Sequence, residues 1–406
     1  MTLRPLPLVI SGRAPGTIVE VQSASLQDHH TFMRILTLCY EFPPLGGGGS
    51  QVVSGLSREL VALGHDVEVI TMGFRGLPAE DLVDGVRVHR VPCLRFSRSV
   101  CTPAEQASYL FAALPEALRR TRQGRFDVNH THFIFPDGVL ARVLRWRSGL
   151  PYVITAHGSD VPRFNPDRFI TLHKVLAPAW RKIVRQASGI VAPSERLAGL
   201  IRSQDPEANP ILIPNGIDPD LYRSDCPKAR RILVVSRLFE RKGVQHLLEA
   251  LTGTDLDHEV HIVGTGPYLP NLEAQARQRG LSVSFHGWMD HESSRFRELY
   301  ETSSIFVCPS EAENFPIVLL EAMSAGLAIV TTRGTGCDEV VGDTGVLVPP
   351  RDPLALRQAL VELTQDPDRC RILGAAARKR LEERFSWPAV AARYAEILAE
   401  VAQSAR

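Results

Sequence analysis

The sequence predicts an α/β protein made of two doubly wound domains that face each other across a cleft. Short apolar segments of strand length alternate with longer helical segments along almost the whole chain, and this alternation indicates parallel sheets with right-handed crossovers. A polar, turn-rich stretch near the middle interrupts the alternation, which then starts again. A length of 406 residues is also too great for one ordinary hydrophobic core.

The first half of the chain starts its alternation at Met33. A strand-like segment at 34–39 leads into a turn rich in proline and glycine at 41–49, and an amphipathic helix is expected at 50–63. Further strands of this half are expected at 67–71, 86–91, 128–131, 152–155, 189–192 and 211–213. We therefore expect residues 33–214 to form an N-terminal domain.

The second half repeats the pattern after a linker. Residues 215–229 are polar, rich in turn formers and without periodicity, which is typical of a connection between domains. Residues 230–385 are expected to form a C-terminal domain of the same kind, and a helical tail at 381–401, broken near Trp387 and Pro388, closes the chain. The strands of this half are expected at 231–236, 259–264, 283–286, 304–308, 328–331 and 346–348.

The composition is typical of a soluble globular protein and excludes several classes. Lys plus Arg number 46 and Asp plus Glu 45, so a net charge of +1 gives no support for nucleic acid binding. The 7 cysteines include no Cys-x-x-Cys pair, which argues against a zinc site or a disulfide framework and indicates a reducing, cytoplasmic environment. No apolar run reaches the roughly 18 residues that a membrane helix needs.

Residues 1–32 do not fit the domain pattern. Their apolar patch, Leu6–Ile10, is interrupted by Pro7 and is too short for the core of a signal peptide. We expect either that Met33 is the biological start or that residues 1–32 form a disordered extension.

The segment from Cys308 to Gly326 combines a strand end, a polar loop and a helix. Pro316 suits the first helical turn, where its missing N–H group costs nothing. The following helix is apolar nearly all round, so we expect it to be buried and Glu321 on it to have a partner. Glu313 in the loop is either an acid favoured by the helix dipole or a ligand-binding group, and the helix N-terminus beside it suits a phosphate.

Polar groups also follow other strands of the second half. Arg237 lies just past one strand, and Lys242 lies just before the next helix. Two cations at these positions could bind a diphosphate, but they are equally compatible with a basic loop exposed to solvent. A tight turn at Gly266 lets the backbone approach a ligand closely. Because the carboxyl ends of parallel strands share one edge of a sheet, we expect the strand-end loops to converge on one ligand. These loops are 236–243, 264–267, 286–290 and 309–316.

The first half offers candidates at its own strand ends. The glycines at 46–49 lie between a strand and a helix, but Gln51 occupies the third glycine position of the dinucleotide fingerprint. We therefore favour a mobile glycine loop at the rim of the cleft over an NAD site. His157 follows a strand and can donate to a sugar hydroxyl or to developing charge. His130 and His132 are ambiguous, and for His130 we favour a structural role.

Two further patterns are weak. The Asp-x-Asp pattern occurs three times, but none of the pairs lies on a convincing strand-end loop, so we expect no metal. The helical regions at 115–125 and 174–186 are rich in Arg and Lys. A solvated basic face is the ordinary interpretation, and transient contact with an anionic bilayer is the alternative.

Seven segments together resemble the retaining family 4 glycosyltransferases, which have the B-type fold of two Rossmann-like domains. The likeness runs from Met33 to about Ala399. It implies transfer of a hexose-type sugar from a nucleoside diphosphate sugar to a hydroxyl acceptor, with retention at the anomeric carbon and without a metal or other cofactor. The basic character of the first half is compatible with a lipid-linked or cell-envelope glycan acceptor and with a peripheral position at the inner face of the cell membrane, but it is equally compatible with a soluble acceptor. The segments are THFIFPDG, TAHGSD, IPNGID, VVSRLFERKG, VGTGP, CPSEAE and ENFPIVLLEAMSAG.

The resemblance implies roles for residues of the C-terminal domain. Arg237 and Lys242 would hold the diphosphate, and Glu321 the ribose hydroxyls. The donor sugar would be held by Glu313 and by the backbone of three residues, Asn314, Phe315 and Pro316. The base would be framed by Gly287, Trp288 and Met289.

For the N-terminal domain the resemblance implies the facing half of the site. His157 would reach the sugar from the opposite domain, and Gly47 and Gly48 would close over donor and acceptor. The terminal helix at 386–403 would cross back onto this domain.

One departure and two rival classes qualify the resemblance. Many relatives have Glu-Gly-Phe-Gly where this chain has Glu313-Asn314-Phe315-Pro316, so we expect Asn314 and Pro316 to influence the choice of donor sugar. Sugar-nucleotide epimerases share the architecture, and so would a non-catalytic sugar-nucleotide-binding protein. The intact set of charged groups and His157 argues against the non-catalytic alternative.

Overall fold

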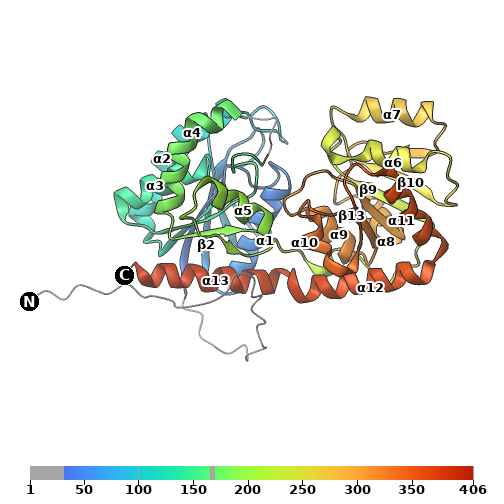
Figure 1. Ribbon diagram of the computed structural model, residues 1–406. Helices are drawn as coiled ribbons and strands as arrows, with labels where there is room; N and C mark the ends of the chain where they lie inside the picture. Colours follow the sequence, from blue (N-terminus) through green and yellow to red (C-terminus); the bar gives the residue numbers. More distant parts are fainter. Residues whose placement is uncertain (1–31, 99, 165–169, 406) are drawn as a thin grey trace, which may run out of the picture. The chain divides into compact units, whose positions relative to one another are not determined.

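The computed structural model describes residues 32–98, 100–164 and 170–405 (Figure 1). Residues 1–31, for which we expect a downstream start or a disordered extension, lie outside the described residues. None of the described helices is long and apolar enough to cross a membrane.

The first sheet has the strand order β3-β4-β2-β1-β5-β6-β7-β8. Its neighbouring strands are parallel except for β3, which is antiparallel to β4. The strands are β1 (Arg34–Leu38), β2 (Asp66–Met72), β3 (Glu80–Val83), β4 (Val86–Val91), β5 (Val128–His132), β6 (Tyr152–Thr155), β7 (Gly189–Ala192) and β8 (Ile211–Leu212). The helices are α1 (Gly48–Ala62), α2 (Pro103–Gly124), α3 (Asp137–Ser148), α4 (Ile170–Gln186) and α5 (Glu195–Gln204).

The second sheet has the order β11-β10-β9-β12-β13-β14, and all its pairings are parallel. The strands are β9 (Arg231–Val235), β10 (Glu259–Val263), β11 (Val283–Phe285), β12 (Ile305–Cys308), β13 (Ala328–Thr332) and β14 (Val346–Val348). The helices are α6 (Val244–Leu251), α7 (Leu269–Gln278), α8 (Ser294–Thr302), α9 (Ile317–Ser324), α10 (Cys337–Val341), α11 (Pro353–Gln365), α12 (Pro367–Arg384) and α13 (Trp387–Ser404). The predicted α/β class with two doubly wound sheets is confirmed.

The alternation of side chains along the strands explains why both faces of the second sheet are covered by helices. In β9, Leu233 and Val235 enter one hydrophobic core, while Ile232 and Val234 enter another on the opposite face. Successive side chains of a strand point to opposite faces, so a strand that is apolar at every position needs cover on both.

Two details of the first sheet differ from the prediction. The edge strand β3 was not expected, because Glu80–Val83 is short, carries two acids and buries little of its surface. Helix α1 begins at Gly48 rather than at residue 50, so Gly48 and Gly49 belong to its first turn, and Gly46 and Gly47 precede it.

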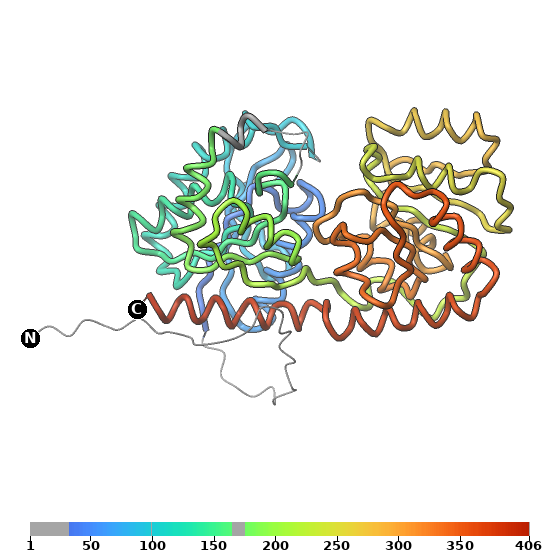
Figure 2. Tube along the Cα trace, viewed as in Figure 1, coloured from blue at the N-terminus to red at the C-terminus, as the bar shows by residue number. Residues whose placement is uncertain are grey.

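The last two helices follow each other with a break at Phe385 and Ser386 (Figure 2). Helix α12 contacts α9 and β13 of the second sheet, whereas Trp387 and Tyr394 of α13 lie in the core of the first sheet. Trp387 packs directly on two glycines: a Cβ atom at Gly55 or Gly216 would lie 2.4 or 2.3 Å from its ring. The indole therefore fits because both positions lack a side chain.

Candidate active site

The strand-end loops of the second sheet are tied together by backbone contacts at its carboxyl edge. Gly264 N donates to Gly287 O at 2.7 Å, which joins the loops that follow β10 and β11. Gly264 has a φ of +129°, and a Cβ there would lie 1.8 Å from Ser236 O, so the loop after β9 approaches as closely as a glycine permits. The predicted convergence of these loops is therefore observed for these three strands.

Lys242 and Glu313 form an ion pair at this edge. Lys242 ends a 3-10 turn after β9 (Glu240–Lys242), and Glu313 precedes α9; both side chains are largely buried. Arg237 lies nearby in sequence but is exposed. Sequence reasoning gave Lys242 and Glu313 separate tasks, and it missed their direct contact because 71 residues separate them.

Glu321 is buried on α9, as expected, and it has a partner. Tyr300 on α8 donates its hydroxyl to Glu321 Oε2 at 2.7 Å, and His291 Nδ1 lies 3.8 Å from Oε1. Burial raises the pKa of Glu321, while His291 and the Tyr300 hydrogen bond act in the opposite direction. The expectation that an acid on this apolar helix needs a partner is confirmed.

The remaining predicted residues of the second domain differ in how much of them is accessible. The side chain of Phe315 packs against Phe385 in the core. Pro316 is the N-cap residue of α9. In the turn after β11, Trp288 is 69% exposed, whereas Met289 is half-buried against the core.

The turn at Gly266 packs against the loop that follows β9. A Cβ at Gly266 would lie 2.3 Å from Leu238 O, so the close approach here is between two loops of the protein.

His157 lies at the carboxyl edge of the first sheet, directly after β6. The carboxylate of Asp160 fixes its backbone by accepting hydrogen bonds from His157 N at 3.1 Å and Gly158 N at 2.9 Å. Its imidazole Nε2 lies 3.0 Å from His132 Nδ1, and its ring packs on Phe133 with 4.4 Å between centroids. Burial lowers the pKa of His157 to about 4, so the ring is neutral at pH 7.

Hydrogen bonds join this edge to the loop before α9. Asn314 Nδ2 donates to His157 O at 3.2 Å, and Asn314 Oδ1 accepts from Ser194 Oγ at 2.7 Å. Ile317, the first residue of α9, would lie 3.7 Å from a Cβ on Gly48. The structure thus brings Gly48, His157 and Asn314 together, and the carboxamide of Asn314 is engaged with protein groups.

Another carboxylate at the first sheet's edge escaped sequence reasoning. Glu41 follows β1, and Arg95 donates to Glu41 Oε1 at 2.8 Å. A Cβ on Gly46 would lie 2.7 Å from Glu41 Oε2, so the Glu41 side chain packs directly against the glycine turn. The sequence feature that could have identified Glu41 is its position as an acid between an apolar strand and the Pro-Pro turn. Its pairing with Arg95 becomes visible only in the fold.

The Asp-x-Asp pairs lie away from the carboxyl edges. Asp220 pairs with Arg378, Asp257 pairs with Arg230 ahead of β10, and Asp366 caps α12. Among the described residues, no group of three or more His, Cys, Asp or Glu side chains is arranged to hold a metal ion.

Two families of known proteins match the two halves of the chain. Residues 46–221 match the family described as Glycosyltransferase Family 4, and residues 229–366 match Glycosyl transferases group 1. The chain is 31% identical to the MMP alpha-(1->4)-mannosyltransferase of Mycolicibacterium hassiacum, over 91% of this chain and 100% of that protein.

Solved structures show the same fold. Sucrose-phosphate synthase from Thermosynechococcus elongatus superposes with a TM-score of 0.78 at 22% identity, covering 92% of this chain and 100% of that one. Anabaena HepE in complex with UDP-glucose gives a TM-score of 0.70 at 18% identity, covering 91% and 100%. The family matches and the mannosyltransferase show that the chain belongs to the group 1/family 4 glycosyltransferases.

Proposed function

We propose that this glycosyltransferase moves a hexose-type sugar from a nucleoside diphosphate sugar to a hydroxyl of a lipid-linked or cell-envelope glycan, with retention at the anomeric carbon. The observation that carries the proposal is the meeting of the Lys242–Glu313 pair, the α9 N-terminus and His157 through Asn314. Cations, a helix N-terminus and a neutral hydrogen-bond donor are the groups that a sugar diphosphate requires. The complex of Anabaena HepE with UDP-glucose supports this donor class.

In this proposal Arg237 and Lys242 bind the diphosphate and stabilise its charge as it leaves, so no metal is needed. Binding of the donor then exchanges the Lys242–Glu313 contact for contacts with phosphate and sugar. Glu321, oriented by Tyr300, accepts hydrogen bonds from the ribose hydroxyls.

The remaining roles concern the sugar and the base. The backbone of Asn314, Phe315 and Pro316 lies along the sugar, and His157 faces it from the first domain. Gly47 and Gly48 approach both substrates, the turn at Gly266 approaches the donor, and the base rests on Trp288 and Met289.

The chemical step follows from retention. Breaking the anomeric bond gives the sugar oxocarbenium character and the diphosphate negative charge. We propose that the acceptor hydroxyl attacks the same face while the leaving phosphate takes its proton. The alternative nucleophile on the first domain is Glu41, whose Oε1 is bound by Arg95. Mass spectrometry of trapped turnover mixtures should show unmodified protein, and a glycosyl adduct on a first-domain residue would refute the same-face route.

The donor assignment is tested by a thermal-shift screen against UDP, GDP and ADP sugars. One nucleotide class should raise the Tm of the wild type by several degrees, and Glu321→Ala should abolish this shift. Glu362→Ala, which removes an exposed acid on α11, is the matched control and should respond like the wild type. No stabilisation of the wild type by any nucleotide sugar, or an equal response of Glu321→Ala, would refute the donor site.

Two assays with the identified donor separate transfer from its rivals. An epimerase converts the donor to an isomer without any acceptor, whereas a transferase requires the acceptor and releases nucleoside diphosphate. Activity that persists in excess EDTA is expected for a metal-independent enzyme. Loss of activity in EDTA with recovery on adding Mg²⁺ or Mn²⁺ would contradict the roles given to Arg237 and Lys242.

The proposal includes peripheral contact with an anionic bilayer through three neighbouring helices, α2, α3 and α4 (Figure 1). Helix α4 contains no acid, and the only acid of α3, Asp137, is buried. Phe111 on α2 and Trp146 on α3 are 83% and 77% exposed. Basic groups with exposed aromatic side chains fit a lipid surface. Among the described side chains of these helices, the exposed basic residues are Arg119, Arg122, Arg145, Arg147, Arg181, Lys182 and Arg185, the last of which pairs with Asp205.

Vesicle sedimentation tests this contact. The protein should sediment with phosphatidylglycerol vesicles at low salt and remain in solution with phosphatidylcholine vesicles. Replacing Arg145, Trp146 and Arg147 together by alanine should reduce sedimentation severalfold without changing transfer to a water-soluble acceptor. Unchanged sedimentation of this variant would exclude α3 as the lipid-facing helix.

A further inference from the structure

Two histidines on neighbouring strands of the first sheet share one hydrogen bond. His132 ends β5, His157 follows β6, and His132 Nδ1 lies 3.0 Å from His157 Nε2. His132 has no exposed surface, and its second nitrogen, Nε2, is buried without a hydrogen-bond partner among the described residues. The second nitrogen of His157, Nδ1, lies on the side of Gly49, where a Cβ would come within 3.7 Å of it.

The shared hydrogen bond admits two arrangements of protons. A neutral imidazole carries one proton, so one of its nitrogens donates and the other accepts. If His157 Nε2 donates to His132 Nδ1, the proton of His132 must be on Nε2, where it is an N–H group buried without an acceptor. If His132 Nδ1 donates, His132 Nε2 is only an unused lone pair, and the proton of His157 must be on Nδ1.

The second arrangement is favoured on energetic grounds. A buried N–H group without an acceptor loses a hydrogen bond that water would have supplied, and such groups are rarer in proteins than acceptors with an unused lone pair. A doubly protonated His132 is also disfavoured, because burial lowers its pKa and the neighbouring rings of His130 and His157 carry no negative charge. The nitrogen that is protonated in one ring is thus set by the bond that the other ring makes.

We propose that His132 is a positioning residue for glycosyl transfer, which fixes His157 in the tautomer that presents its Nδ1–H group to the substrate side. The inference rests on the proposed function in so far as His157 contacts the donor sugar. His157 then donates a hydrogen bond to a sugar oxygen and cannot act as a base from that nitrogen. Gly49 keeps the space in front of Nδ1 free of a side chain.

The tautomer can be measured directly by ¹⁵N NMR of histidine-labelled protein. The His157 signals are assigned as those lost in His157→Asn, and two-bond couplings tell the protonated nitrogen from the bare one. The wild type should show the proton of His157 on Nδ1 and that of His132 also on Nδ1. A proton on His157 Nε2 would overturn the proposal, whatever the activity of the protein.

Substitutions at His132 give the kinetic test. His132→Leu removes the donor and should reduce kcat/KM about 10-fold to 100-fold, since a wrong tautomer weakens one hydrogen bond made in the transition state. His132→Asn can place its amide N–H where Nδ1 was, and it should recover most of this loss. His132→Gln places the amide at the Nε2 position and should resemble His132→Leu. Equal loss in the Asn and Leu variants would contradict the proposal.

A double-mutant cycle separates positioning from a general packing role. If His132 acts through His157, His132→Leu should have no further effect on kcat/KM when His157 is already alanine. Additive losses would assign His132 a packing role instead. The thermal shift with the donor nucleotide should be the same in all these variants, because the nucleotide groups lie on the other domain.

Failure of the two proposals is distinguishable. A wild type that transfers no sugar from any nucleotide donor would refute the proposed function, while the NMR result would still decide the tautomer. A wild type that transfers sugar but shows the proton of His157 on Nε2 would refute the positioning role alone.

Discussion

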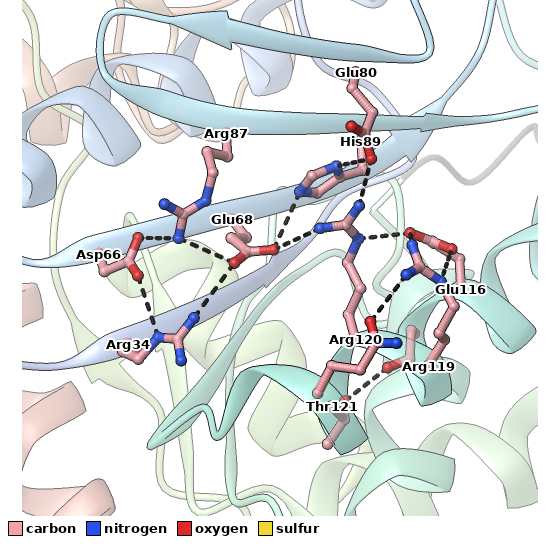
Figure 3. A network of polar contacts seen from close by, with 12 residues as sticks. Arg34, Asp66, Glu68, Glu80, Arg87, His89, Glu116, Arg119, Arg120 and Thr121 are labelled. Carbon is pink, nitrogen blue, oxygen red and sulfur yellow. Dashed lines mark hydrogen bonds and ion pairs between the residues drawn. The ribbon is translucent and has the colours of Figure 1, made fainter.

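The two edges of the first sheet use polar side chains in opposite ways. At the amino edge, Figure 3 shows Glu68 of β2 surrounded by four basic groups: Arg87 Nη2 and Arg120 Nη1 at 3.0 Å, His89 Nε2 at 3.1 Å and Arg34 Nη2 at 3.7 Å. Every partner comes from a neighbouring strand or from α2. The amino edge is therefore a charged network in which the central acid has partners on both oxygens.

At the carboxyl edge of the same sheet, beside the Glu41–Arg95 pair, three histidines are uncharged and one of them is incompletely paired. His130 bonds to Thr155 Oγ1 at 2.9 Å, His132 bonds to His157, and His132 Nε2 has no partner among the described residues. A buried polar atom without a partner is a candidate for use by a ligand or a reaction. His89 Nδ1 at the amino edge also has no hydrogen bond, but a carboxylate oxygen of Glu80 lies 3.5 Å from it. Under the proposed function, we therefore expect the amino edge to contribute to stability and the carboxyl edge to activity.

The largest effect is expected from His157→Ala. Removing one preorganised donor at the reaction centre should lower kcat/KM about 100-fold, while the Tm should change by no more than about 2 °C. His89→Ala, the matched histidine of the amino edge, should lower the Tm and leave kcat/KM unchanged at a temperature where it is folded. Steady-state kinetics and thermal melts of both variants measure these effects. A similar kcat/KM in the two variants would contradict the proposed functional difference between the two edges.

Glu68→Gln should produce the converse result. The amide cannot accept strong hydrogen bonds from several cations, and those cations would remain packed together without a counter-charge, so the free energy of unfolding should fall by about 2–3 kcal/mol. Transfer activity of the folded fraction should be unchanged. Urea denaturation, monitored by tryptophan fluorescence, measures the free energy of unfolding. A variant that loses activity while keeping its stability would show that the network serves the site.

The sequence was sufficient for the strands and for the loops that meet at the carboxyl edges, because apolar runs and turn residues are local signals. It was not sufficient for pairings such as His132–His157, which exists because β5 and β6 are neighbours in register, His132 beside Thr155. Glu68 likewise resembled an ordinary exposed residue of a strand, and its partner Arg120 is 52 residues away. Long-range partners are properties of the fold and leave no local pattern.

The two edges should also lose stability in different pH windows. Burial lowers the pKa of His157 to about 4 and that of His130 to about 3, against a usual 6.5, so the unfolded chain binds more protons below pH 6.5. Their contribution is present above pH 6.5 and lost as the pH falls toward 4. The hydrogen bond from His89, followed by that from Arg120, lowers the pKa of Glu68 to about 2, so its contribution is lost between pH 4.5 and 2.

Melting curves at successive pH values test this separation. Two buried histidines titrate in the upper window, which should therefore lower the free energy of unfolding by about 3 kcal/mol for each of them. Glu68 is reached by solvent, which screens its charge, so the lower window should lower the free energy of unfolding by only about 1–2 kcal/mol. His157→Asn should reduce the decline between pH 6.5 and 4 without removing it, because His130 still titrates there, and Glu68→Gln should reduce only the decline below pH 4.5. If Glu68→Gln flattened the upper window, the histidines of the carboxyl edge would not be its cause.

The smallest effect is expected from Glu80→Ala, which tests whether burial gives the amino edge its strength. Glu80 contacts two of the four basic residues that surround Glu68: Arg120 Nη2 lies 2.7 Å and His89 Nδ1 3.5 Å from Glu80 Oε1. Its side chain is 71% exposed, against 8% for Glu68. Water screens an exposed pair and replaces its hydrogen bonds, so the loss should be below about 0.5 kcal/mol. A loss equal to that of Glu68→Gln would show that contact with Arg120 and His89, rather than burial of the acid, stabilises this edge.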